Sequence, residues 1–134
     1  MRMRRLAALL GAIGILLTGC GGGEGDDAPE VFRLGPTKTC LEQANVPIRI
    51  RGLDFVAETA LGGGLFARFP GNHVTLAFGD TDEGARGIEN RYRKQAAGSI
   101  QVDKVVMRNA NVVMVWAGGP NASDLGVIER CLAP

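Results

Sequence analysis

The chain has 134 residues, of which 46% are hydrophobic and 22% are charged, and its formal net charge is +1. This length accommodates one globular domain, and the composition excludes a wholly disordered chain and a collagen-like protein. Fifteen basic residues against fourteen acidic ones also fall short of the basic density of a nucleic-acid-binding domain.

The first twenty residues have the layout of an export signal. Three arginines within residues 2–5 precede an apolar stretch over residues 6–17, which is too short for a relaxed transmembrane helix. The stretch ends in Leu-Thr-Gly-Cys at residues 17–20. These four residues resemble the lipobox of bacterial lipoproteins. The resemblance implies that residues 1–19 are removed and that Cys20 carries diacylglycerol, with acyl chains such as palmitate holding the protein on a membrane. In the alternative, 1–19 is an ordinary secretory signal and Cys20 stands there by chance.

Residues 20–30 are expected to be a flexible tether, because Gly-Gly-Gly-Glu-Gly-Asp-Asp at 21–27 has no apolar side chain to bury. A single globular domain is expected over residues 31–134. Within it, Cys40 and Cys131 form an even pair in an exported, oxidising setting, which predicts a disulfide. Two free thiols or a metal pair are the alternatives, and no Cys-x-x-Cys or Cys/His cluster supports the metal.

The first half of the domain begins with a predicted helix over residues 37–44, which Thr37 can cap and Asn45 can end. Alternation over residues 46–50 predicts a strand, with Pro47 favouring a sheet edge. Residues 53–61 are either a brief helix capped by Asp54 or irregular. Two strand-like runs, 65–69 and 73–78, flank Pro-Gly-Asn at 70–72, which predicts a hairpin.

A helix is predicted next over residues 81–97, with Asp80 and Glu83 resembling a capping box. A second hairpin follows, with strands over 102–107 and 112–116 around residues 109–111, and a helix over 122–132 ends the domain. The repeated order suggests two ββα units that share one sheet. We therefore expect an α+β fold of two layers, in which an antiparallel sheet of four or five strands carries two or three helices on one face.

The second face of that sheet is the candidate binding surface. Arg49, Arg51, Arg68 and Thr75 are expected there, outside the helical layer. The strand ending at Trp116 is apolar on both parities, which is typical of a strand buried on both sides. If helices cover only one face, this strand adds apolar contacts, Trp116 included, to a surface for recognition. Simple central burial is the alternative.

Catalytic chemistry is weakly signalled. His73 is the only histidine, and an enzyme would have to combine it with Asp80, Asp82 or Glu83. The acidic cluster at 79–84 lacks the calcium-loop pattern, because glycine falls at the fifth position and no glutamate at the twelfth. Neither a catalytic residue nor a metal site is assigned, and no cofactor is expected.

Beyond the lipobox, the chain is similar only to small bacterial envelope lipoprotein domains of unknown function. The sequence thus favours a membrane-anchored, extracytoplasmic binding or interaction module without catalytic activity, acting on an envelope protein, a cell-wall component or a small-molecule ligand. The alternatives are a small extracytoplasmic hydrolase that uses His73 and a purely structural envelope lipoprotein.

Overall fold

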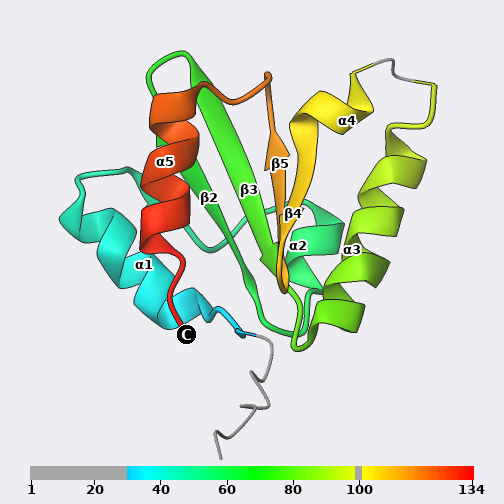
Figure 1. Cartoon of the computed structure of the whole chain (residues 1–134), viewed down its shortest axis with the longest axis horizontal. Coiled ribbons are helices and arrows are strands. Elements are labelled where there is room, and N and C mark those ends of the chain that lie inside the picture. Colours follow the sequence, from blue (N-terminus) through cyan, green and yellow to red (C-terminus); the bar gives the residue numbers. More distant parts are fainter. Residues whose placement is uncertain (1–29, 99–100) are drawn as a thin grey trace, which may run out of the picture.

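A computed structural model describes residues 30–98 and 101–134. Five strands and five helices lie in this part of the chain, which confirms the predicted α+β class and the antiparallel sheet. Along the sheet the order is β1-β2-β3-β5-β4, and every neighbouring pair is antiparallel (Figure 1). The elements are α1 (Leu34–Gln43), β1 (Ile48–Arg49), α2 (Phe55–Glu58), β2 (Gly64–Phe69), β3 (Asn72–Phe78), α3 (Asp82–Gln95), α4 (Val102–Val105), β4 (Val106–Asn109), β5 (Val112–Trp116) and α5 (Ala122–Cys131).

Both predicted hairpins are present. The first turns at Gly71, whose φ of 71° lies in the left-handed region that glycine tolerates best. The second turns at Ala110, which holds a φ of 48°. The two hairpins join through their second strands, with Leu76 of β3 opposite Met114 of β5. β3 is therefore the middle strand of the sheet, and β5, whose residues are all apolar, lies beside it.

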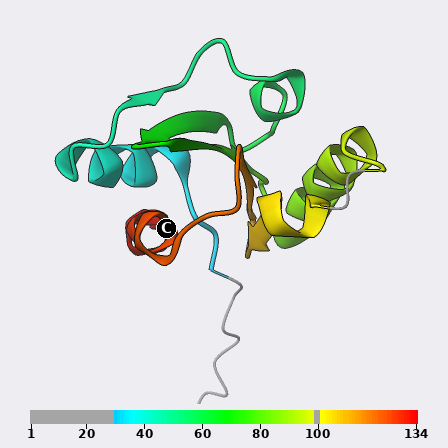
Figure 2. The same cartoon turned by 90° about the horizontal axis from the view of Figure 1, so that it is seen from above.

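Helices cover both faces of the sheet, so the expected two-layer arrangement with helices on one face is not what forms. The first face carries Leu76 and Met114, and α1 and α5 pack over it. The second face carries the smaller Ala77 and Val113, and α2 and α3 pack there. Figure 2 shows α1 and α5 on one side of β2 and β3, with α2 on the other. A strand that is apolar on both parities needs cover on both sides, and the helices of the two ββα segments provide it by taking opposite faces.

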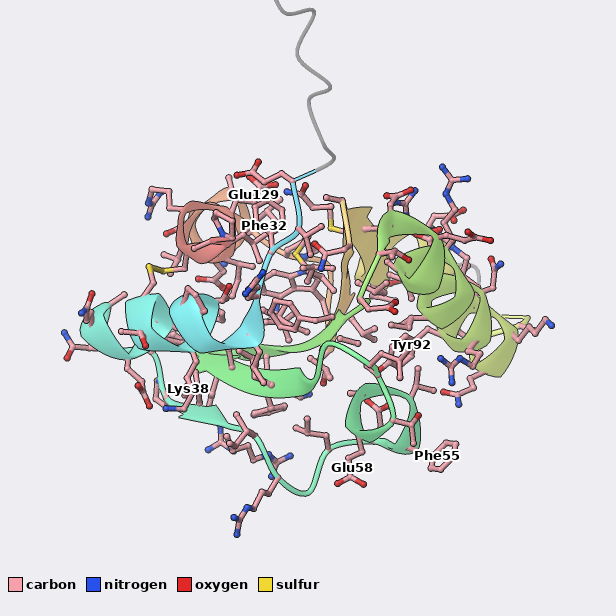
Figure 3. The ribbon with its side chains drawn as sticks, turned by 90° about the horizontal axis from the view of Figure 1, so that it is seen from below. Phe32, Lys38, Phe55, Glu58, Tyr92 and Glu129 are labelled. Atoms are coloured by element: carbon pink, nitrogen blue, oxygen red, sulfur yellow. A yellow bond between two sulfur atoms is a disulfide. The ribbon has the colours of Figure 1, made fainter. Side chains whose placement is uncertain are left out.

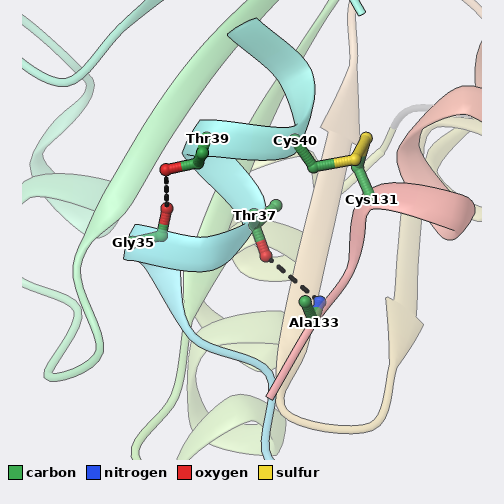
Figure 4. Close-up of a disulfide and its surroundings, with 6 residues drawn as sticks. All are labelled: Gly35, Thr37, Thr39, Cys40, Cys131 and Ala133. Atoms are coloured by element: carbon green, nitrogen blue, oxygen red, sulfur yellow. Dashed lines mark hydrogen bonds between the residues drawn. A yellow bond between two sulfur atoms is a disulfide. The ribbon is translucent and has the colours of Figure 1, made fainter. Parts of the chain in front are cut away.

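The predicted disulfide is confirmed. Cys40 of α1 and Cys131 at the end of α5 are bonded, with their Cα atoms 5.3 Å apart (Figure 4). Thr37 lies beside it and is buried inside α1, where its hydroxyl accepts a hydrogen bond from the Ala133 backbone at 3.4 Å. Thr37 is therefore not the N-cap that the sequence suggested: α1 begins three residues earlier, at Leu34.

The other boundaries agree with the prediction in part. Asp54 caps α2, as the helical alternative for this segment predicted, and accepts a hydrogen bond from the Ala57 backbone at 3.0 Å. At α3 the cap is Thr81 and not Asp80, because the Thr81 hydroxyl accepts from the Gly84 backbone at 2.9 Å. The strand expected from residue 102 begins only at Val106, after α4. Valines at 102 and 105 have helical spacing, and both pack against the core of the second face.

Candidate functional site

The membrane-related expectations concern residues 1–29, and these lie outside the described residues. They comprise the signal peptide, the lipid on Cys20 and most of the tether. Among the helices of residues 30–98 and 101–134, none is long and apolar enough to cross a membrane.

The residues of the hydrolase alternative do not converge. His73 is the second residue of β3, whereas Asp80, Asp82 and Glu83 all follow the opposite end of this seven-residue strand. At about 3.3 Å per residue, those ends are roughly 20 Å apart. Asp82 is also engaged elsewhere, since it pairs with Arg108 of β4 and Arg86 of α3. Nor does the described part of the chain contain a group of three His, Cys, Asp or Glu residues placed to hold a metal ion.

The second face of the sheet is only partly covered. The α2 and α3 helices lie over Ala77 and Val113, near the end of β3 that leads into α3. Towards the other end, cross-strand pairing places a group of exposed or half-buried side chains on the same face. We call this group the Phe66 face; it consists of Arg49, Phe66, Arg68, His73 and Thr75.

Phe66 is at the centre of this face. The Arg49 guanidinium carbon lies 4.4 Å from the centroid of the Phe66 ring, in cation–π contact. On the other side the His73 ring centroid is 4.9 Å away, with the two rings inclined at 37°. A hollow of about 240 Å³ lies over β1 and β2, lined by Phe66, Arg49, Arg68 and the strand start at Pro47 and Ile48. The face is thus an aromatic shelf bordered by cations.

The charge of this shelf is not neutralised by the protein. None of the ion pairs among the described residues involves Arg49, Arg51 or Arg68. The two acidic residues between β1 and β2 have other partners: Asp54 caps α2, and Glu58 accepts a hydrogen bond from the Leu53 backbone. A guanidinium without a carboxylate partner keeps its planar set of donors available, a geometry that matches carboxylate and phosphate groups.

A hydrogen bond between Tyr92 and Asp54 holds together the two helices that cover part of the second face of the sheet. The Tyr92 hydroxyl donates to the Asp54 carboxylate, with both oxygens at 2.9 Å, and so joins α3 to the N-cap of α2. Figure 3 shows Tyr92 between α3 and α2. Burial first, and then the Asp54 carboxylate, raise the pKa of the Tyr92 phenol far above its usual range. The phenol therefore stays a hydrogen-bond donor, and α2 is held over Ala77 instead of over the Phe66 face. The adjacent Phe55 points away from the domain and is 74% exposed.

Of the five residues predicted for the binding surface, Arg49, Arg68 and Thr75 belong to the Phe66 face, and Arg51 and Trp116 do not. Arg49 and Arg68 are there, as alternation along their strands indicated. Arg51 follows β1 and lines a different hollow, beside α1 and α2. Trp116 is only 2% exposed and lies on the first face, with its ring centroid 5.9 Å from that of Phe69. Central burial is therefore the correct interpretation of this strand, and a surface position of Trp116 is wrong, because helices cover that parity of β5.

Sequence reasoning missed Phe66 as a surface residue. The signal was present, since in the run 65–69 the residues at 66 and 68 share one parity, and the buried Leu65 and Ala67 share the other. His73 was predicted as a hairpin residue and not as part of the binding surface, whereas its position opposite Arg68 places it on the same face.

A second hollow adjoins the Phe66 face at the beginning of β1. Its volume is about 460 Å³, and it lies between the end of α1, the β2–β3 turn and α5. Its lining includes Pro47 and Arg68, which also border the first hollow. The rest is mainly apolar, with Val46, Phe69, Pro70 and Val127. The site is thus a cationic, aromatic shelf next to an apolar groove. No protein-family model, curated protein or solved structure matches this chain.

Proposed function

We propose that this protein is a membrane-anchored lipoprotein of the cell envelope whose domain is a binding module without catalytic activity. The lipobox-like residues ending at Cys20 support the anchoring. The observation that supports binding is the Phe66 face, where Arg49 and Arg68 border an aromatic ring and have no carboxylate partner among the described residues. Its ligand is a carboxylate- or phosphate-bearing molecule.

A purely structural lipoprotein would not require this arrangement. Arg108, which packs between β4 and α3, is paired with Asp82 and Glu89. Arg49 instead lies over Phe66, with its side chain exposed. The ring holds the guanidinium in place while its donors remain free for an anion, which is the preorganisation that a binding site needs.

The anchoring is tested by mass spectrometry of the chain purified from membranes. We expect a chain that starts at Cys20 and carries the mass of diacylglycerol, and a Cys20→Ala variant that is not lipidated. A mature chain without lipid would overturn the anchoring.

The binding is tested on the full chain in nanodiscs of zwitterionic lipid, by titrating inorganic phosphate and pyrophosphate and recording amide NMR shifts. We expect the shifts to gather on β1 and β2, and the Arg49→Gln/Arg68→Gln variant to weaken binding at least tenfold. The matched control is Arg33→Gln/Arg130→Gln, which removes two exposed arginines elsewhere and should bind like the parent. Equal shifts in both variants, or none in the parent, would overturn the proposed site.

A further inference from the structure

The apolar groove beside the Phe66 face is lined chiefly by Val46, Pro47, Phe69, Pro70 and Val127, and we call it the Val127 groove. Its volume of about 460 Å³ lies within the range of roughly 300–1,000 Å³ that small-molecule sites occupy. Two turns and a helix border it. Asn45 ends α1 in the left-handed conformation, with φ 58°, and Pro70 begins the turn after β2. The third side is α5, which contributes Val127.

The groove and the Phe66 face meet at one fixed pair of residues. The Arg68 backbone N–H donates to the Pro47 carbonyl at 2.9 Å, and both residues line both hollows. On one side of this pair lie Arg49 and the Phe66 ring. On the other side the lining is mainly apolar, and apart from Arg68 its one polar residue is Asn45. A single molecule that crosses the pair would place a charged group against the arginines and an apolar group in the groove.

We propose that the ligand of this site is an amphipathic anion, a phosphate or carboxylate attached to an apolar chain that fills the Val127 groove. The inference rests on the proposed function and adds the chemical class of the ligand. Charge complementarity selects the anionic end, because the shelf carries arginines without carboxylate partners. The lining of the groove selects the apolar end, since a polar group there would lose its hydration without gaining partners from Val46, Phe69 or Val127.

Trp116 supplies a reporter for occupancy of the groove. It is the only tryptophan of the chain, and its ring lies 5.9 Å from that of Phe69, which lines the groove. An alkyl chain of the ligand that packs on Phe69 changes the surroundings of the Phe69–Trp116 pair and therefore the tryptophan fluorescence. The alkyl phosphates used below do not absorb in the tryptophan band, so they do not interfere with the signal.

The test titrates the full chain in zwitterionic nanodiscs with butyl phosphate, octyl phosphate and octanol, below the concentration at which octyl phosphate forms micelles. Empty nanodiscs correct for partition into lipid. Each fully buried methylene tightens binding about fourfold. Octyl phosphate should therefore bind at least tenfold more tightly than butyl phosphate, and octanol should bind more weakly than octyl phosphate.

Two variants separate the ends of the ligand. Arg49→Gln should weaken both alkyl phosphates at least tenfold and leave octanol unchanged, because Arg49 borders the shelf but does not line the groove. Val127→Phe fills the groove and should abolish the advantage of octyl over butyl phosphate, while inorganic phosphate still shifts the β1 and β2 amides. Val31→Phe, at an exposed valine remote in sequence from the groove, is the matched control and should keep that advantage. Parent-like urea midpoints establish that each variant is folded.

The outcomes distinguish this inference from the proposed function. If butyl and octyl phosphate bind equally while inorganic phosphate still shifts the shelf amides, the amphipathic ligand is refuted and the anion-binding module stands. If octanol binds as tightly as octyl phosphate, the groove takes apolar molecules unselectively and the inference is again refuted. If neither inorganic phosphate nor an alkyl phosphate binds, both proposals fail.

Discussion

Replacing Asn111 by alanine would remove the most connected polar side chain of the interior. Asn111 is 1% exposed and is the last residue of the turn between β4 and β5. Its carbonyl oxygen accepts from the Phe32 N–H at 2.7 Å, and its amide donates to the Phe32 carbonyl at 2.9 Å and to the Gly79 carbonyl at 2.8 Å. The side chain therefore joins the segment before α1, the end of β3 and the start of β5.

The Asn111→Ala substitution leaves three backbone groups buried without that partner. Each such group costs about 1–3 kcal/mol, and part of this is recovered if the Phe32 segment moves towards water. We expect the free energy of unfolding to fall by about 3–5 kcal/mol, a large share of the roughly 5–15 kcal/mol typical of a domain. Urea unfolding followed by the fluorescence of the single tryptophan measures it.

The matched control is Asn90→Ala, at an exposed position of α3, which should change the free energy of unfolding by less than about 0.5 kcal/mol. If Asn111→Ala loses less than about 1 kcal/mol, the three backbone groups must regain partners cheaply. In that case Asn111 does not hold the three segments together.

Three further predictions concern the disulfide, two glycines and the tyrosine. Replacing Cys40 and Cys131 by alanine should lower the urea-derived free energy of unfolding by about 4 kcal/mol, because the bond spans 91 residues; a loss under 1 kcal/mol would contradict the chain-entropy account. Gly79→Ala should cost at least about 2 kcal/mol in the same assay, since its Cβ would lie 2.6 Å from a backbone nitrogen of α3, whereas Gly87→Ala meets nothing within 4 Å and should gain up to about 1 kcal/mol; equal effects would refute the steric argument. Tyr92 is the only tyrosine, and its pKa is raised in the folded protein, so the stability that the phenol contributes is complete below pH 10 and is lost as the pH rises beyond that. Phenolate absorbance should therefore be absent at pH 11 while the protein is folded. The Tyr92→Phe variant should not show this loss of stability at alkaline pH.

Local patterns predicted those parts of the fold that depend on neighbours in sequence. The turn at Gly71 and the end of α1 at Asn45 both depend on residues a few positions apart, and both were predicted correctly. Where two local signals competed, the prediction failed. Val102 and Val105 fit a strand or a helical turn equally, and only packing against the second face decided for α4.

Only part of the candidate site was predictable from the sequence. Alternation along β1 and β2 placed Arg49 and Arg68 outside the core, because a strand directs successive side chains to opposite faces. The same rule could not place Trp116, since its strand is apolar on both parities and the pattern does not say which face a helix covers. Nor could it show that the Phe66 face stays open, because this follows from where α2 is held by the bond between Tyr92 and Asp54.

The sequence by itself determined the fold class, the two hairpins and the pairing of Cys40 with Cys131, because turn chemistry, periodicity and cysteine parity are all contained in the order of residues. Only the tertiary structure decided that helices lie on both faces, that Trp116 is interior and that an apolar groove adjoins a cationic shelf. The physical reason is that periodicity records whether a side chain is buried, but not what buries it. Which residue buries a given side chain is decided by packing between segments far apart in sequence. Asn111, for example, is buried against the backbone of Phe32.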